Sequence, residues 1–337
     1  MSARRRLGLA AAAVGAVSGL VVAGERVAAR RLRGSHDADG GEPIVVEFDR
    51  SFRLPAHDGG ELFVVEAGSG PPILLSHGVT LSLRVWAKQL KSLAAEGFHV
   101  VAYDHRGHGD SHLGPAGHGL DQIAADLRSV IEAMDLRDVV VVGHSMGGIA
   151  TQLLCLDHPD TARERVAGIV LLSTLARSPF AANPRLAQVA TWMADRLPDG
   201  AGALKARDLG LVIARLGFGR SPSPGQVEAT RQMILSTDTR TRREATSALA
   251  GLDLTARLGA IDRPTLVIGG TADLITPLAE SRRIARRIPG ARLEVLEGGG
   301  HMLMFEQPGT VDRLIADFAR AIQHGTGSVG SAAGAGA

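Results

Sequence analysis

The sequence predicts an α/β protein whose core is a mostly parallel, eight-stranded sheet, flanked by helices and interrupted by one long helical insertion. Short apolar runs recur along the chain, and many are followed by a stretch with helical periodicity. From the third run onward they are rich in Val, Ile and Leu, as is typical of strands that helices cover on both faces. The alternation stops between about residues 178 and 258, where only helical patterns occur.

The candidate strands begin with a hairpin at one edge of the sheet. The first two lie on either side of residues 57–60, which read His-Asp-Gly-Gly and favour a turn between antiparallel strands. The candidates are residues 44–48, 61–66, 73–76, 99–103, 139–142, 168–172, 265–268 and 292–296. Between two of them, residues 120–134 place their apolar side chains on one face of a helix.

These patterns divide the chain into four parts. We expect a basic and apolar leader with a linker over 1–42, and a core formed by 43–177 and 259–323. A helical cap is expected over 178–258, and a disordered Gly/Ala/Ser-rich tail over 324–337. The cap contains large apolar side chains that either face a pocket or pack the cap against itself: Phe180, Trp192, Met193, Leu216, Phe218 and Met233.

The basic residues are concentrated in the leader. The formal net charge is +2, from 37 basic and 35 acidic residues, but residues 1–34 hold seven arginines and a single acid, so the rest of the chain is net acidic. An uncharged stretch over 7–23 lies between two groups of arginines. This arrangement predicts membrane association through residues 4–33 or export by a signal peptide. The alternative is a leader with no membrane role and a cytoplasmic protein.

Composition argues against several classes of function. Aromatic residues make up only 3% of the chain, and the folded part is net acidic, so no nucleic-acid partner is expected. Cys155 is the only cysteine and lies in an apolar run, which indicates a small core residue. No spaced set of Cys and His ligands occurs, so no metal or cofactor is predicted.

A candidate nucleophile follows the strand at 139–142. Residues 143–148 read Gly-His-Ser-Met-Gly-Gly and lead into an apolar helix. This is a G-x-S-x-G motif between a strand and a helix, in which two glycines permit a sharp turn that exposes Ser145. The structural alternative for such a short motif is a turn without chemistry.

The serine needs a base, and the base needs an acid that orients it. Asp273 is the only acid in the loop after the strand at 265–268, and His301 lies in a glycine loop after the strand at 292–296. Both loops leave the carboxyl ends of strands, as Ser145 does. The order Ser145, Asp273, His301 therefore predicts a catalytic triad. Taken singly, Asp273 could instead cap a helix and His301 could be a surface residue.

A third loop can stabilise negative charge at the same edge. The strand at 73–76 leads into His77-Gly78-Val79-Thr80. The backbone N–H groups of Val79 and Met146 are the candidate oxyanion hole. His77 is interpreted as a residue that holds this loop, and His105, His108 and His144 are also assigned structural roles.

Together these residues resemble the α/β-hydrolase superfamily over roughly residues 43–323. The resemblance rests on His77-Gly78, on the turn at 104–111, on the serine motif, and on Asp273 and His301 in their glycine-rich loops. It implies an α/β-hydrolase fold with a helical cap. It also implies that Ser145, Asp273 and His301 are the triad and that Val79 and Met146 are the oxyanion donors.

The fold hosts many activities, so the reaction must be read from the site. We expect a serine esterase or lipase-like enzyme that cleaves a small to medium hydrophobic ester. A cofactor-free haloperoxidase or perhydrolase resembles it in the opening His-Gly-x-x-x-Ser over 77–82, although such relatives tend to carry an aromatic residue where this chain has Val79. A carbon–carbon bond or lactone hydrolase is a further alternative. Outside enzymes, the alternative is a ligand-binding protein that kept the fold.

Overall fold

The computed structural model describes residues 44–178, 207–220 and 222–327. Its strands are β1 (Arg50–Pro55), β2 (Glu61–Ala67), β3 (Pro72–Ser76), β4 (His99–Tyr103), β5 (Val139–His144), β6 (Val166–Leu172), β7 (Thr265–Gly270) and β8 (Arg292–Leu296). They form one sheet in the order β1-β2-β4-β3-β5-β6-β7-β8. Strand β2 is antiparallel to β1 and β4, and the other neighbours are parallel. The predicted eight-stranded, mostly parallel sheet is confirmed.

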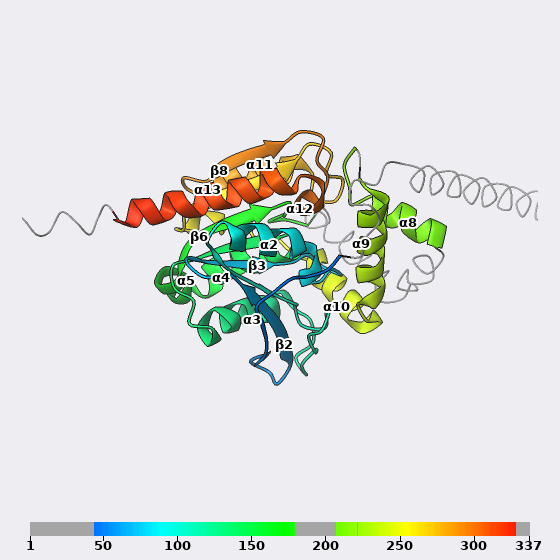
Figure 1. Cartoon of the computed structure of the whole chain (residues 1–337), viewed down its shortest axis with the longest axis horizontal. Helices are drawn as coiled ribbons and strands as arrows, with labels where there is room; N and C mark the ends of the chain where they lie inside the picture. Colours follow the sequence, from blue (N-terminus) through cyan, green and yellow to red (C-terminus); the bar gives the residue numbers. More distant parts are fainter. Residues whose placement is uncertain (1–43, 179–206, 221, 328–337) are drawn as a thin grey trace, which may run out of the picture.

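Helices cover both faces of this sheet (Figure 1). The helices of the core are η1 (Leu83–Trp86), α2 (Ala87–Ala95), α3 (Leu120–Ala133), α4 (Met146–Asp157), α5 (Pro159–Arg165), η2 (Leu258–Ala260), α11 (Leu278–Arg287), α12 (Leu303–Glu306) and α13 (Pro308–Gly327). Helices α2 and α13 pack on one face, and α3, α4 and α11 pack on the other. Of these, α3 begins where predicted and ends one residue early.

The sheet separates two apolar cores because successive side chains of a strand point to opposite faces. In β3, Leu75 packs in the core beneath α2 and α13, whereas Leu74 packs in the core beneath α3 and α4. All six residues of β5 are buried. Side chains on both faces of β5 therefore pack against other parts of the core and fix its position. The predicted nucleophile directly follows this strand.

The first strand differs from the prediction. Residues 44–48 are not a strand, and β1 instead spans Arg50–Pro55, where it pairs with β2 from Arg50↔Glu66 to Pro55↔Glu61. The expected hairpin is present, but its first strand is the segment directly before the turn, in which the half-buried Phe52 and Leu54 alternate with exposed residues. A tight turn pairs the residues next to it, and Val45 and Phe48 remain exposed.

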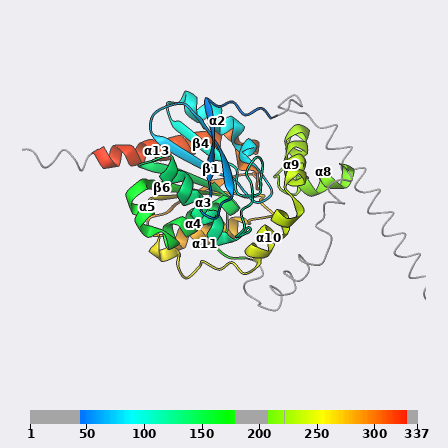
Figure 2. The same ribbon diagram turned by 90° about the horizontal axis from the view of Figure 1, so that it is seen from below.

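The segment between β6 and β7 is helical where it is described. It contains α8 (Arg207–Arg215), α9 (Pro224–Ser236) and α10 (Thr239–Ala250), close to the helical patterns expected there. These helices gather at one end of the sheet in both views (Figures 1 and 2). The predicted leader, residues 179–206 and 221 of the predicted cap, and residues 328–337 lie outside the described residues. No helix in the described part is long and apolar enough to cross a membrane.

Candidate active site

Ser145 lies in a sharp turn between β5 and α4. Its φ is 52° and its ψ is −115°, a combination that is strained for a residue with a side chain. The turn is fixed by its neighbours, because the Ser145 N–H donates to Leu172 O at 3.1 Å and the Thr174 hydroxyl donates to Ser145 O at 2.6 Å. The strained conformation therefore persists at the position where the sequence predicts a nucleophile.

Two glycines make this turn possible. A Cβ atom on Gly147 would lie 2.2 Å from the carbonyl oxygen of Ser76, and one on Gly143 would lie 2.4 Å from the carbonyl oxygen of Gly147. Both distances are far below van der Waals contact, so a side chain at either position would force β3, β5 and α4 apart. The G-x-S-x-G pattern thus follows from the close approach of backbone segments.

Asp273 lies in the loop after β7 and is almost fully buried, with 5% exposure. Its Oδ1 accepts hydrogen bonds from the N–H groups of Ile275 and Thr276, both at 2.8 Å, and its Oδ2 accepts one from the Thr276 hydroxyl at 2.6 Å. Burial raises the pKa of Asp273, but attraction to His301 and these hydrogen bonds outweigh it and hold the pKa below 3.8. The carboxyl group is therefore an anion at neutral pH.

His301 lies in the loop after β8, and its ring contacts Asp273. Its Nδ1 is 3.1 Å from Asp273 Oδ2 and 3.1 Å from the Thr276 hydroxyl oxygen. The carboxylate is an acceptor, so Nδ1 carries the proton and Nε2 is the nitrogen with a lone pair. This is the tautomer that a general base needs.

His144 connects the base to the nucleophile. Its Nε2 is 3.0 Å from the carbonyl oxygen of His301, and the two rings lie 4.7 Å apart between centroids. The structure thus brings the three predicted triad residues to the same edge of the sheet. Within the described chain the hydroxyl of Ser145 makes no hydrogen bond to the His301 ring, and catalytic contacts of this kind often tighten only with substrate.

The loop after β3 also contacts the nucleophile. Gly78 approaches so closely that a Cβ atom on it would lie 3.0 Å from the Cβ of Ser145. Val79 follows in the same loop, and Met146 is the first residue of α4, where backbone N–H groups carry partial positive charge. In the described part of the chain neither N–H donates to another group of the protein. Both therefore remain candidates to donate to an oxyanion next to Ser145.

The turn over residues 104–111 lies beneath this loop and is built around a buried carboxyl group. Asp104 accepts hydrogen bonds from Leu83 N at 2.7 Å and from Asp110 N at 2.9 Å, while the Ser111 hydroxyl donates to Asp104 O at 2.6 Å. Burial raises the pKa of Asp104 to about 7. These contacts join the turn to the helix after the oxyanion loop.

Sequence reasoning missed the contact between the insertion and the base. Gly217 O accepts hydrogen bonds from the N–H groups of His301 and Met302, at 2.9 and 3.1 Å. Glu306 Oε2 accepts from Gly219 N at 2.7 Å and from Gly300 N at 3.1 Å. The insertion therefore supports the loop of His301 directly. No local pattern predicts this, although the glycines at 217 and 219 were a possible signal.

The candidate pocket residues of the insertion divide into three groups. Phe218 and Met233 are buried in the same apolar core as Met302, whereas the Leu216 side chain is 54% exposed. Phe180, Trp192 and Met193 lie outside the described residues.

The residues that the structure describes contain no candidate metal site. Among them, no group of three or more His, Cys, Asp or Glu residues is arranged to hold a metal ion.

Comparisons with known proteins agree with this fold. The family model described as "alpha/beta hydrolase fold" matches residues 71–308. A non-heme haloperoxidase of Rhodococcus erythropolis is 34% identical over 274 residues, which are 79% of this chain and 98% of that protein. The non-heme chloroperoxidase CPO-A1 of Kitasatospora aureofaciens is 33% identical over 72% of this chain and 90% of its own length. A thermophilic esterase from Thermogutta terrifontis is 29% identical, with a TM-score of 0.68 over 81% of this chain and 99% of its own.

Proposed function

Because the chain belongs to the α/β-hydrolase family, we propose that it is a serine hydrolase that cleaves carboxylic esters through an acyl-enzyme intermediate. The single observation that carries the proposal is the 3.1 Å contact between His301 Nδ1 and Asp273 Oδ2, next to the strained turn at Ser145. This arrangement leaves an imidazole Nε2 free to take a proton at the same edge of the sheet as a serine hydroxyl.

The first half of the reaction forms the acyl-enzyme. His301 Nε2 takes the proton of the Ser145 hydroxyl as Oγ attacks the ester carbonyl carbon. The negative charge that develops on the carbonyl oxygen is stabilised by the N–H groups of Val79 and Met146. The tetrahedral intermediate then collapses, and the protonated His301 gives its proton to the leaving alcohol.

The second half releases the acid. Water approaches the acyl-enzyme, His301 Nε2 takes one of its protons, and the resulting hydroxide adds to the acyl carbon. When this intermediate collapses, His301 returns the proton to Ser145. Asp273 remains ionised throughout. Its carboxylate fixes the tautomer of His301 and stabilises the imidazolium that forms. Every proton transfer uses side chains of this chain, so the proposal needs no metal or cofactor.

A second candidate activity is perhydrolysis at the same serine. It is favoured by the His-Gly-x-x-x-Ser opening over 77–82 and by the 34% identity to a protein named a non-heme haloperoxidase. In that reaction hydrogen peroxide, instead of water, adds to the acyl-enzyme and releases a peracid and the free serine. The test is production of peracid from acetate and hydrogen peroxide, compared with ester hydrolysis by the same preparation.

The experiment for the main proposal is labelling with a fluorophosphonate probe, which modifies an activated serine. The full chain should be labelled and Ser145→Ala should not. Turnover of p-nitrophenyl esters of increasing acyl length then measures which chain length the site accepts. A folded wild-type protein that neither labels nor hydrolyses any ester would contradict the proposal and favour a ligand-binding role.

We also propose that residues 4–33 associate with a membrane or direct export. The support is the charge pattern alone, in which two groups of arginines flank an uncharged stretch. Cell fractionation of the full chain, beside a chain that lacks residues 1–42, tests it. Equal recovery of both in the cytoplasmic fraction would contradict it.

A further inference from the structure

The candidate oxyanion donor Val79 lies between two peptide groups, and a buried histidine contacts each of them. His77 Nδ1 is 2.7 Å from the carbonyl oxygen of Gly78. The other nitrogen of the same ring, Nε2, accepts a hydrogen bond from the His105 N–H at 2.9 Å. A carbonyl oxygen only accepts and a backbone N–H only donates, so His77 is neutral with its proton on Nδ1.

The contact to Gly78 O determines where the Val79 N–H points. The carbonyl of Gly78 and the N–H of Val79 belong to one peptide group, which is planar and trans, so the two bonds point in opposite directions. By holding the oxygen on one side, His77 directs the N–H to the other. Rotation of this peptide would remove the N–H from the oxyanion position without moving any side chain of the triad.

His108 fixes the other side of Val79. Its Nε2 accepts a hydrogen bond from Thr80 N at 3.1 Å, and its Nδ1 donates to the carbonyl oxygen of Arg106 at 3.0 Å. Thr80 has a φ of 58°, which is unfavourable for a residue with a Cβ, so its conformation needs support from outside the loop. The same tautomer therefore occurs in both histidines.

The environment of the two rings keeps them neutral. Neither side chain is exposed, and their centroids lie 5.4 Å apart in an edge-to-face arrangement. Burial lowers the pKa of His77 well below 6.5, and it lowers that of His108 to about 4. A neutral imidazole has one donor and one acceptor, and each ring uses both.

We propose that His77 and His108 are positioning residues that orient the Val79 N–H toward the oxyanion next to Ser145. They act through the loop and do not touch substrate. The inference rests on the proposed function, because it matters only if Ser145 attacks a carbonyl group. It predicts that each histidine contributes through one particular ring nitrogen, Nδ1 in His77 and Nε2 in His108.

Amide substitutions separate the two nitrogens. Asn places its amide near the position of Nδ1, and the longer Gln places its amide near that of Nε2. H77N keeps the donor to Gly78 O, whereas H77Q loses it. H108Q keeps the acceptor for Thr80 N, whereas H108N loses it. A general requirement for packing would rank Asn and Gln the same way at both positions, but the proposal requires opposite rankings.

The measurement is kcat and KM for a p-nitrophenyl ester, with fluorophosphonate labelling rates and melting temperatures of all four variants. We expect kcat of H77Q to be about tenfold or more below that of H77N. The kcat of H108N should be below that of H108Q by a similar factor. The reason is that losing one oxyanion donor lowers the rate by about a hundredfold or more. KM should change little. The exposed His112, replaced by Asn and by Gln, is the matched control and should show no difference.

The outcomes are distinguishable. A wild-type protein that is not labelled at Ser145 contradicts the proposed function itself, and the inference falls with it. An active wild type in which Asn and Gln have equal kcat at both positions overturns the inference alone. Should a variant fail to fold, nitrogen-15 NMR of histidine-labelled wild type decides the matter: both rings are expected as neutral Nδ1–H tautomers, and the other tautomer at either position would overturn it.

Discussion

His144 Nε2 donates a hydrogen bond to the carbonyl oxygen of His301, so the residue before the nucleophile holds the backbone of the base. The donor nitrogen lies 3.0 Å from the oxygen, and the His144 side chain is fully buried. Burial, with repulsion from His301, lowers the pKa of His144 well below 6.5, so the ring remains neutral. This contact joins the end of β5 to a loop that lies more than 150 residues further along the sequence.

The first prediction follows from this contact. His144→Gln can still donate from a nitrogen near the position of Nε2, whereas the shorter His144→Asn cannot reach His301 O. We expect kcat of the Asn variant to be about tenfold lower than that of the Gln variant, because a small misplacement of a base is costly. Steady-state kinetics with an ester measure the difference, and equal kcat values would refute the role of this hydrogen bond.

A second prediction concerns Thr276, whose hydroxyl donates to Asp273 at 2.6 Å. Thr276→Val removes a hydrogen bond to the ionised carboxylate, so the pKa of Asp273 should rise. An acid whose folded pKa is depressed contributes above that pKa and loses its effect as the pH falls through it. The stability that Asp273 contributes should therefore be lost at a higher pH in Thr276→Val than in wild type, while Thr276→Ser should keep the wild-type profile. Urea unfolding at several acidic pH values measures the difference.

The control for this second prediction is Asp273→Asn, which removes the carboxylate and should lower kcat far more than Thr276→Val does. An amide at this position can no longer hold the proton on His301 Nδ1, and it cannot stabilise the imidazolium. By comparison with triads in general, kcat should fall by about 10³–10⁴-fold. An effect as small as that of Thr276→Val would mean that another acid orients His301.

Much of this arrangement could be predicted from the sequence because its signals are local. Strand β5 is a run of valines, and the glycines around Ser145 mark a turn that only small residues permit. The parallel order of strands then places the loops of Asp273 and His301 at the same edge. These inferences need only the pattern of one segment and the rule that carboxyl ends of parallel strands meet.

The remaining features depend on contacts between distant segments. Nothing near Glu306 indicates that its carboxylate accepts hydrogen bonds from Gly219 and Gly300. The sequence misplaces strand β1 for a related reason: its position is set by pairing with β2 next to the turn, and the more apolar run at 44–48 lies outside that pairing. The contribution of Thr276 is also visible only once its hydroxyl is placed between Asp273 and His301.

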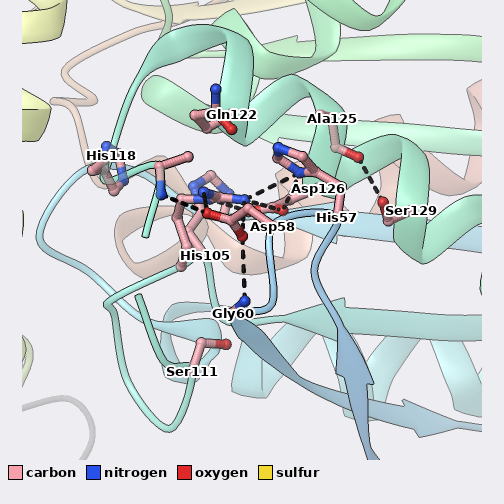
Figure 3. Close-up of polar contacts among 12 residues, drawn as sticks. His57, Asp58, Gly60, His105, Ser111, His118, Gln122, Ala125, Asp126 and Ser129 are labelled. Atoms are coloured by element: carbon pink, nitrogen blue, oxygen red, sulfur yellow. Dashed lines mark hydrogen bonds and ion pairs between the residues drawn. The ribbon is translucent and has the colours of Figure 1, made fainter. Parts of the chain in front are cut away.

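A third prediction concerns the buried ion network beneath the turn at 104–111. Arg106 is fully buried, and its Nε and Nη2 each lie 2.6 Å from an oxygen of Asp126, while its Nη1 lies 3.1 Å from Asp58. Asp58 and Asp126 lie close together (Figure 3). Arg106→Met should destabilise the protein by about 3–5 kcal/mol, because Asp126 would remain buried without its partner. Denaturant unfolding measures this.

The double variant Arg106→Met with Asp126→Leu is the control for this network. It removes the guanidinium and the more buried of its two carboxylate partners and leaves Asp58, whose side chain is 10% exposed, so it should be more stable than Arg106→Met alone. Arg106→Lys should not restore stability, since an ammonium group cannot bridge two carboxylates in the way that the guanidinium does. A double variant as unstable as the single one would show that packing, and not the unpaired charge, dominates.

A fourth prediction concerns stability in acid. His118 is 4% exposed, and burial, with repulsion from His108, lowers its pKa to about 3. Below about pH 6.5 the unfolded chain then binds more protons than the folded one. As the pH falls from there toward the pKa of the folded state, this residue lowers the free energy of unfolding by roughly 1 kcal/mol per pH unit. His118→Leu should therefore gain stability relative to wild type as the pH falls.

Comparing the two proteins isolates His118 from other groups. Asp104 works in the opposite direction, because its pKa is raised to about 7 and its protonation favours the folded state as the pH falls. That contribution is the same in wild type and variant and cancels in the difference. Urea unfolding at several pH values between about 7 and 5 gives the difference, and a constant offset at all pH values would contradict the assignment.

The last prediction tests how the insertion supports the base. Glu306 is a single acceptor for two backbone N–H groups, one from Gly219 in the insertion and one from Gly300 next to His301. Glu306→Ala leaves both donors without this partner, and an unpaired buried donor costs about 1–3 kcal/mol, so the loop of His301 should shift away from the insertion. We expect kcat to fall by about tenfold or more with little change in KM, and Glu306→Gln, which keeps one oxygen acceptor, should retain more activity.

The matched control is Glu297→Ala in the loop of His301, because its side chain is 75% exposed and its ion pair with Arg220 lies at the surface, where such pairs contribute little. If Glu306→Ala and Glu297→Ala had the same kcat, the contact with Gly219 and Gly300 would not position the base.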